Sequence, residues 1–178
     1  MKKAILPIFV LAMLLALVGS ASAGGTPEDI TFTIDGSTID PGKFEQKRCK
    51  YEFKDLTAVG SVTGGLEGLF TYDEEGKVDL CPDSGPPSGS NEGVMTIVTG
   101  QGTLVIEFKG VTELESQTGP SSVWGVSGDW ELKSATPTSG YAGIEDTGEY
   151  SGHTYLEEDP ADSWFEVTFE GWFYTDLD

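Results

Sequence analysis

The sequence predicts an all-β protein: a single antiparallel β-barrel of about eight strands. Three observations support this prediction. Apolar and polar residues alternate with a period of two in many short segments. The 24 glycines punctuate these segments at the positions where turns are expected. Beyond the first 23 residues, no segment shows the 3.6-residue apolar period of an amphipathic helix. We expect seven to nine strands, mostly antiparallel and joined by short connections.

The chain begins with the features of a cleavable secretory signal peptide over residues 1–23. Two lysines form a short basic head, Ile5–Val18 is an apolar run, and Ala21 and Ala23 provide the small residues of a cleavage site. The apolar run is shorter than the roughly 20 residues that cross a bilayer. We therefore expect a secreted domain, residues 24–178, with no membrane span after the signal is removed.

The chain is strongly acidic. It has 30 acidic and 10 basic residues and a formal net charge of −20, which becomes two more negative when the signal is removed. Such a surface repels nucleic acid and anionic membranes, so we expect no nucleic-acid partner. It favours solubility and attracts cations or basic partners. The charge leaves the oligomeric state open.

Each predicted strand presents one apolar face. In the last strand, Phe165, Val167 and Phe169 alternate with polar residues, and the same alternation occurs in the earlier segments. The positions expected to face the barrel interior are Ile30, Phe32, Ile34, Leu66, Phe70, Tyr72, Leu104, Ile106, Phe108, Trp124, Val126, Trp130, Leu132, Phe165, Val167, Phe169 and Phe173. The polar face of the last strand also carries Trp164, Trp172 and Tyr174. These rings cover a sheet edge, pack under a loop, or form an exposed aromatic binding strip.

Four connections are predicted from turn-forming residues. Asp73–Gly76 predicts a hairpin tip, and Thr99–Gly102 predicts a tight turn between two strands. Cys81–Asn91 is rich in Pro, Gly and Ser and predicts a loop without regular structure. Glu157–Asp162 predicts a second, strongly acidic loop.

The two cysteines, Cys49 and Cys81, are expected to form a disulfide, because an exported protein folds under oxidising conditions. The bridge would stabilise the fold by about 3 to 4 kcal/mol through chain entropy. A metal or redox centre at these cysteines is disfavoured, since there is no C-x-x-C spacing and His153 is the only histidine.

Two glycine-rich stretches carry a family resemblance. Gly64–Tyr72 and Ser139–Gly152 resemble allene oxide cyclase-like barrels, and the second contains their G-x-G-aromatic segment, which dirigent proteins share. Asn91–Val94 and Gly102–Ile106 also look like the uncharacterised exported bacterial members. The resemblance covers Leu56–Tyr174. It implies an eight-stranded antiparallel barrel, often with an apolar interior pocket, but it assigns no catalytic residue to this chain.

The search for catalytic motifs yields no catalytic residue. A Ser-His-Asp or Cys-His arrangement would need His153, which is expected at the surface, and no G-x-S-x-G nucleophile elbow occurs. The phosphate-binding G-x-x-x-x-G-K-[ST] motif is absent. Glu145 and Asp146, in the family-like turn, are expected to be solvated.

The candidate binding residues fall into two sets. The apolar stripes suggest a pocket for a small apolar ligand, lined by Phe70, Leu104, Ile106, Phe108, Trp130, Phe165 and Phe169. Calcium is the metal that the sequence favours most, because it prefers oxygen ligands. The candidate calcium ligands are Asp73, Glu74, Glu75 and Asp79, with Glu157, Glu158, Asp159 and Asp162 as a second cluster. Neither cluster matches the EF-hand loop.

Three functions remain open at this point. The favoured one is a non-enzymatic exported barrel that binds a small apolar ligand or an extracellular partner. The alternatives are a barrel-pocket enzyme of the cyclase or isomerase type and a calcium-dependent structural or adhesive surface protein. A filled interior would argue against the first two functions, whereas polar groups converging inside the barrel would favour catalysis.

Overall fold

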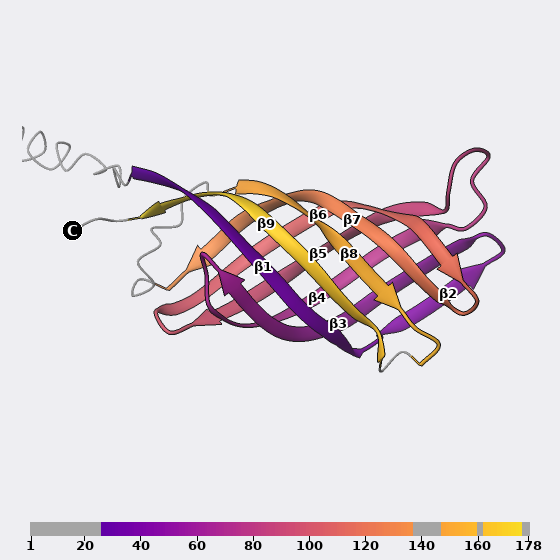
Figure 1. The fold of residues 1–178 in the computed structure, drawn as a ribbon, viewed down its shortest axis with the longest axis horizontal. Helices are drawn as coiled ribbons and strands as arrows, with labels where there is room; N and C mark the ends of the chain where they lie inside the picture. The colour runs from indigo at the N-terminus through magenta and orange to yellow at the C-terminus, as the bar shows by residue number, and fades with distance from the viewer. Residues whose placement is uncertain (1–25, 137–146, 160–161, 176–178) are drawn as a thin grey trace, which may run out of the picture.

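The computed structural model describes residues 26–136, 147–159 and 162–175, with side chains from 29 to 172 within these ranges. This part of the chain forms nine strands (Figure 1). The strands are β1 (Thr26–Asp40), β2 (Lys43–Lys47), β3 (Lys50–Gly64), β4 (Gly68–Asp79), β5 (Ser88–Thr99), β6 (Gly102–Thr118), β7 (Ser121–Ala135), β8 (Thr147–Leu156) and β9 (Trp164–Thr175). Within these ranges, no helix is long and apolar enough to cross a membrane.

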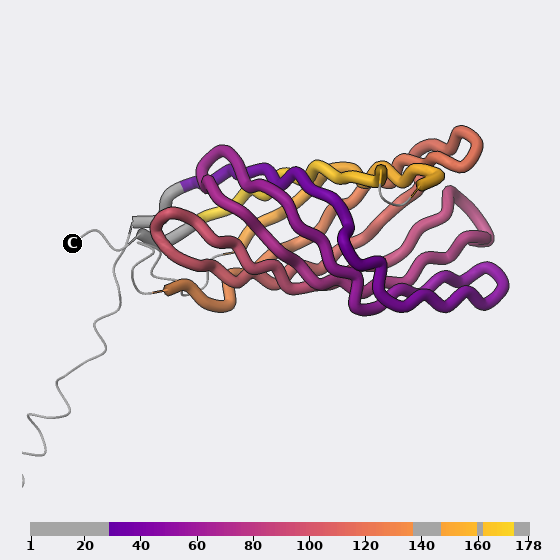
Figure 2. The backbone as a smooth tube through the Cα atoms, turned by 90° about the horizontal axis from the view of Figure 1, so that it is seen from below, coloured from indigo at the N-terminus to yellow at the C-terminus, as the bar shows by residue number. Residues whose placement is uncertain are grey.

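Eight of the strands close into a barrel. The sheet order is β1-β9-β8-β7-β6-β5-β4-β3-β2, and an additional antiparallel pairing of β1 with β3 completes the ring. The short strand β2 pairs only with β3 and lies outside the ring. The β2–β3 hairpin projects beyond one end of the barrel (Figure 2). The predicted all-β barrel of about eight strands is therefore confirmed.

Two local backbone features allow β3 to change partners. Gly42 adopts a φ of 70° and donates its N–H to Asp40 Oδ1 at 2.9 Å, which interrupts the strand between β1 and β2, although both run antiparallel to β3. Asp55 adopts a φ of 58° at the point where the β3–β4 register shifts between Phe53 and Leu56. An irregularity of this kind bends a strand. The first part of β3 therefore pairs with β2, and the second part joins β1 to close the barrel.

The apolar stripes meet inside the barrel. Phe32 from β1 stacks on Phe169 from β9 with ring centroids 5.0 Å apart, and it meets Trp130 from β7 edge-on at 6.3 Å. The largest fully buried side chains are Trp130, Phe32, Phe70, Met95, Ile97, Leu104, Ile106 and Val62. Alternation along the sequence predicted most of these positions, because each strand has one face toward the core.

The predicted hairpin tip at Asp73–Gly76 is wrong. These residues lie in the middle of β4, where Gly76 pairs with Asn91 of β5. Glycine is present here for packing and not for a turn, since a Cβ on Gly76 would meet the Phe53 ring at 2.5 Å. The turn-forming composition was therefore misleading, because an inward-facing glycine in a strand has the same sequence signature as a turn.

The other three connections agree with the sequence to different degrees. The turn at Thr99–Gly102 is confirmed, and Thr99 Oγ1 accepts the N–H of Gly102 at 3.2 Å. The loop predicted over Cys81–Asn91 is shorter than expected, since β5 already begins at Ser88. The acidic loop at Glu157–Asp162 follows β8 as predicted, although 160–161 lie outside the described residues. The signal segment 1–23 and the part of the family-like stretch at 139–146 also lie outside them.

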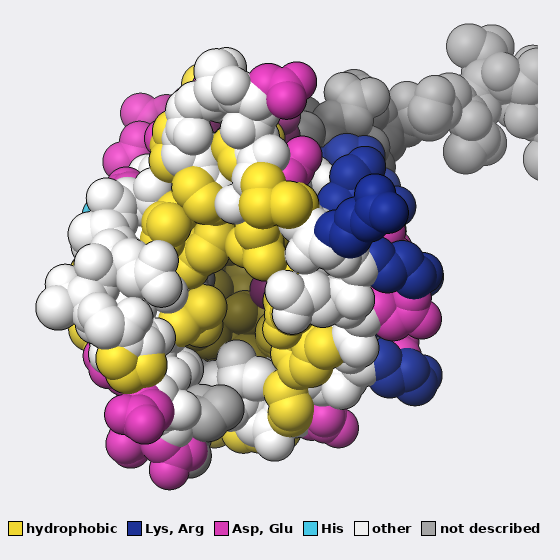
Figure 3. All heavy atoms as spheres, turned by 90° about the vertical axis from the view of Figure 1, so that its right-hand side faces the viewer, with side chains coloured by type: hydrophobic (Ala, Val, Ile, Leu, Met, Phe, Trp, Pro, Cys, Tyr) yellow, Lys and Arg dark blue, Asp and Glu magenta, His cyan; other side chains and the backbone are white. Residues whose placement is uncertain are grey.

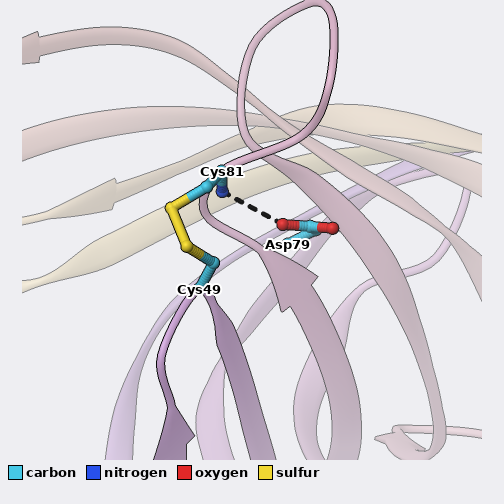
Figure 4. Close-up of a disulfide and its surroundings, with 3 residues drawn as sticks. All are labelled: Cys49, Asp79 and Cys81. Carbon is cyan, nitrogen blue, oxygen red and sulfur yellow. Dashed lines mark hydrogen bonds between the residues drawn. A yellow bond between two sulfur atoms is a disulfide. The ribbon is translucent and has the colours of Figure 1, made fainter.

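The predicted disulfide between Cys49 and Cys81 is formed (Figure 4), with a Cα–Cα distance of 5.2 Å. A backbone hydrogen bond joins the two segments beside it, and a side-chain acceptor fixes the backbone at Cys81. Leu80 N–H donates to the carbonyl of Cys49 at 2.6 Å, and Cys81 N–H donates to Asp79 Oδ1 at 3.0 Å. The bridge thus joins the turn of the β2–β3 hairpin to the start of the β4–β5 loop.

Removing this bridge should lower stability without changing the fold. For the double variant Cys49→Ser/Cys81→Ser, we expect the free energy of unfolding to fall by about 3 to 4 kcal/mol, because the unfolded chain gains conformational freedom. Urea unfolding measures this change. Wild-type protein in excess reductant should reach the same midpoint as the variant. An unchanged midpoint in both samples would contradict the prediction.

Candidate ligand site in the barrel mouth

The barrel interior is packed in one half and hollow in the other. Toward the β3–β4 and β5–β6 turns, the inward side chains are buried in one cluster. Toward the β4–β5 and β6–β7 connections, inward side chains such as Leu56, Tyr72 and Val126 keep intermediate exposure. Figure 3 shows this end of the molecule hollowed and lined largely by hydrophobic side chains. We call this hollow the barrel mouth.

Three polar side chains form a chain of hydrogen bonds inside the barrel at the mouth. The Tyr150 hydroxyl of β8 donates to Asn91 Oδ1 of β5 at 3.3 Å, and Asn91 Nδ2 donates to Glu74 Oε1 of β4 at 2.8 Å. Asn91 and Tyr150 are only 5% and 4% exposed. Tyr150 donates to Asn91, and Asn91 donates to Glu74, so the Glu74 carboxyl group is the final acceptor. We call these three residues the polar trio.

Glycines make the polar trio possible. Tyr150 pairs with Gly128, Gly128 with Gly110, and Gly110 with Asn91, so all four residues lie on one line across β8, β7, β6 and β5. The Tyr150 side chain crosses two strands to reach Asn91. A Cβ on Gly110 would meet the Tyr150 hydroxyl oxygen at 2.4 Å, so the ring needs a glycine in its path.

The electrostatics of the polar trio follow from its burial. Removal of water raises the pKa of Glu74 to about 7, and the hydrogen bond from Asn91 opposes this increase. Glu74 keeps intermediate exposure, because the mouth opens above it while the barrel wall excludes water from its other sides. Burial raises the pKa of Tyr150 to about 12 and also raises the pKa of Tyr72. Near neutral pH the carboxyl is partly ionised and both phenols stay protonated.

Aromatic rings surround the polar trio. Tyr72 lies 5.3 Å from Phe165 and 5.6 Å from Phe108, measured between ring centroids. Phe108 in turn meets Tyr150 edge-on at 5.9 Å. The polar groups therefore lie next to apolar walls, which is the composition of a small-molecule site.

All seven predicted ligand-lining residues face the interior: Phe70, Leu104, Ile106, Phe108, Trp130, Phe165 and Phe169. Most of them are packed in the barrel core and do not line an open pocket. Leu104 and Ile106 have no exposed surface and belong to the packed half. Three of the seven, Phe70, Phe108 and Phe165, contact Tyr72 at the mouth. The expected pocket is therefore displaced toward one end of the barrel.

The polar trio itself was missed by the sequence analysis. Because residues two apart on a strand share a face, the alternation that placed Tyr72 inside also places Glu74 inside. That signal was present in the sequence. The partnership with Asn91 and Tyr150 was not, since 17 and 76 positions separate them from Glu74 along the chain.

The predicted calcium ligands do not converge. Asp73 and Glu75 lie on the outer face of β4 and Glu74 on the inner face, while Asp79 accepts the N–H of Cys81. Across the described ranges, no group of three or more His, Cys, Asp or Glu side chains is arranged to hold a metal ion. The calcium site expected at Asp73, Glu74, Glu75 and Asp79 is therefore not formed, because the segment is a strand and not a loop.

A groove runs around the outside of the barrel between two rows of mostly acidic side chains. Apart from Asp55, the single lining residue on β3, its lining residues fall in threes on successive strands, and each row follows the cross-strand register. Asp129, Glu149 and Glu170 are consecutive neighbours in one row, on β7, β8 and β9. All three are exposed. Like charges in direct cross-strand contact destabilise a sheet, so this row costs stability.

The remaining candidates are ordinary surface residues. His153 is exposed, as predicted, with Nε2 3.2 Å from a carboxylate oxygen of Glu115. Trp164 stacks on Tyr155 at 3.9 Å, and Trp172 is 54% exposed farther along β9. The two tryptophans are separated by acidic and threonine side chains on the outer face, so they do not form a continuous strip. The side chain of Tyr174 lies outside the described residues, as do Glu145 and Asp146.

Comparisons with known protein families, curated proteins and solved structures found no match for this chain. The fold and the site therefore define its class. It is a closed, eight-stranded antiparallel barrel with a disulfide-linked hairpin and a polar trio in its mouth. The resemblance to the allene oxide cyclase and dirigent barrels stays a prediction.

Replacing the buried carboxyl should change the pH dependence of stability. The folded pKa of Glu74 is about 7 against an ordinary 4.5, so folding takes up a proton between these values. The stability that protonated Glu74 contributes is complete below pH 4.5 and is lost as the pH rises through 7. For Glu74→Gln, we expect unchanged stability near pH 4 and a gain of about 3 kcal/mol at pH 8. Urea unfolding across this range measures the difference.

Glu75→Gln provides the matched control, because this neighbour has the same chemistry but faces outward. Its stability curve should run nearly parallel to that of the wild type. Parallel curves for Glu74→Gln as well would show that the carboxyl is not buried in the folded protein.

Reversing one charge in the outer row should stabilise the barrel. Glu149→Lys replaces two like-charge contacts, with Asp129 and Glu170, by two favourable ones. We expect a gain of about 0.5 to 1 kcal/mol at low salt that shrinks in 1 M NaCl. Ser151→Lys, two positions along the same outer face, is the control and should change stability less. A loss of stability in Glu149→Lys, or no response to salt, would contradict this expectation.

Proposed function

We propose that this protein is an exported barrel that binds a small, largely apolar ligand in the barrel mouth. The observation that carries the proposal is the polar trio, which places a carboxyl group at the base of an apolar hollow. Buried polar groups cost free energy unless they are paired. Glu74 accepts a hydrogen bond from Asn91 at Oε1. A ligand that pairs with the carboxyl would reduce the cost of burying it.

The composition of the mouth supports a ligand with an apolar body. Leu56 lies directly across from Glu74 on the neighbouring strand, and Tyr72 and Val126 also face inward with intermediate exposure. Small-molecule sites combine such apolar walls with a few polar groups that fix orientation. The packed half of the barrel provides a rigid base beneath the site.

Export is supported by two independent features. The N-terminal sequence has the order of a signal peptide, and Cys49 and Cys81 are joined in the folded domain. Disulfides persist mainly outside the reducing cytosol. The site would therefore meet extracellular or periplasmic ligands.

A fluorescence titration tests the binding function. The neutral probe N-phenyl-1-naphthylamine should bind saturably with a large increase in emission, because it enters an apolar environment. Val126→Trp should fill the mouth and weaken binding at least tenfold. Val111→Trp, on the exposed outer face of β6, is the control and should bind like the wild type. Emission that does not saturate, or equal binding by the Val126→Trp variant once circular dichroism confirms that it folds, would contradict the proposal.

Proton-transfer catalysis is the second candidate, and one observation favours it. A general base works best with a pKa near the operating pH, and burial raises the pKa of Glu74 to about 7. Tyr150 adds a protonated phenol to the same cluster. A barrel-pocket isomerase or cyclase would use such a pair. Binding requires less than catalysis does, because it needs only the apolar mouth and one polar group that orients the ligand.

A further inference from the structure

We infer that the ligand of the barrel mouth is an organic cation, a protonated amine attached to a compact apolar body. This inference rests on the proposed binding function and names the class of its ligand. The observation behind it is the Glu74 carboxyl group, which lies inside an aromatic mouth where none of the described lysine, arginine or histidine side chains is buried beside it.

No cationic side chain in the described part of the protein balances the charge of Glu74. Every lysine, arginine and histidine that the structure describes is solvent-exposed. Five of them cluster on the β2–β3 hairpin, and the others lie on outer strand faces. Buried charges in proteins are normally paired. A cationic ligand would supply the missing partner.

The hydrogen-bond direction in the polar trio also selects for a donor. The Tyr150 hydroxyl donates to Asn91 Oδ1, and Asn91 Nδ2 donates to Glu74 Oε1. This series of hydrogen bonds ends at the Glu74 carboxylate. Its oxygens can therefore accept further hydrogen bonds, but the ionised group cannot donate one. An ammonium group has three N–H donors and no acceptor, so it matches this end of the chain.

The aromatic rings favour the same ligand class. The ring of Tyr72 lies 5.6 Å from Phe108 and 5.3 Å from Phe165, measured between ring centroids, and these rings surround the polar trio. The faces of such rings carry negative partial charge and attract a cation, while their carbon surface suits an apolar body.

The electrostatic field of the whole protein also favours a cationic ligand. The net charge is −20, and the outer groove places rows of carboxylates around the barrel wall. Such a field raises the local concentration of cations and repels anions. An anionic ligand would meet both this field and the like charge of Glu74.

Cation binding would be linked to the protonation of Glu74. An ammonium group favours the ionised carboxylate, so binding should release protons near pH 7. With a pKa of about 7, the ionised fraction of Glu74 falls about tenfold between pH 8 and pH 6. The affinity for the amine should fall by the same factor. A neutral alcohol of the same shape should show little change.

The experiment uses the mature protein and three matched compounds: 2-phenylethylamine, 2-phenylethanol and 3-phenylpropanoate. Calorimetry at pH 8, with displacement of N-phenyl-1-naphthylamine as a second readout, gives their affinities. We expect the amine to bind at least tenfold more tightly than the alcohol and the carboxylate to bind most weakly. Glu74→Gln should remove the preference for the amine. Glu75→Gln makes the same change in net charge on the outer face and should keep it.

The outcomes separate the inference from the proposed function. If the alcohol or the carboxylate binds as tightly as the amine, the cation inference is overturned while the binding function stands. An amine preference that survives Glu74→Gln also overturns it, because the attraction then comes from the outer field. If neither the compounds nor the probe bind saturably, both fail. The pH dependence of wild-type affinity gives the same test if Glu74→Gln does not fold.

Discussion

The antiparallel pairing of β1 with β3 is the constraint on which the rest of the structure depends. It closes the sheet and gives each of the eight barrel strands an inner and an outer face. Along one edge of β3, residues 50–54 pair with β2 and residues 57–64 pair with β1, and the positive φ at Asp55 lies between these two stretches. Without closure, the apolar stripes would have no common core and the mouth would not exist.

Inside the barrel, large aromatic side chains pack over glycines, which leave room for them. Tyr150 extends over Gly128 and Gly110, while Trp130 lies against glycines of β8 and β9 and donates its Nε1–H to the Glu170 carbonyl at 3.1 Å. A barrel of eight strands has room for only a limited number of large side chains, so neighbouring positions must be small. The same arrangement that fills one half of the barrel delivers a phenol to the polar trio in the other half.

The charges of this protein have two different consequences. On the outer wall, neighbouring carboxylates such as Asp129 and Glu149 repel one another but remain hydrated, so their cost is modest. In the mouth, Glu74 is shielded from water, and its pKa rises to about 7 as a result. Among the acidic side chains that the structure describes, this carboxyl is set apart by its position, which composition does not reveal.

The sequence by itself determined the β-class, the inward stripes such as Ile30, Phe32 and Ile34, and the Cys49–Cys81 pair, because these depend on local alternation and on there being only two cysteines. The tertiary structure alone decided which half of the interior is filled and which polar groups meet. Those outcomes depend on register between distant strands. A shift of one residue would move an inward side chain to the outer face.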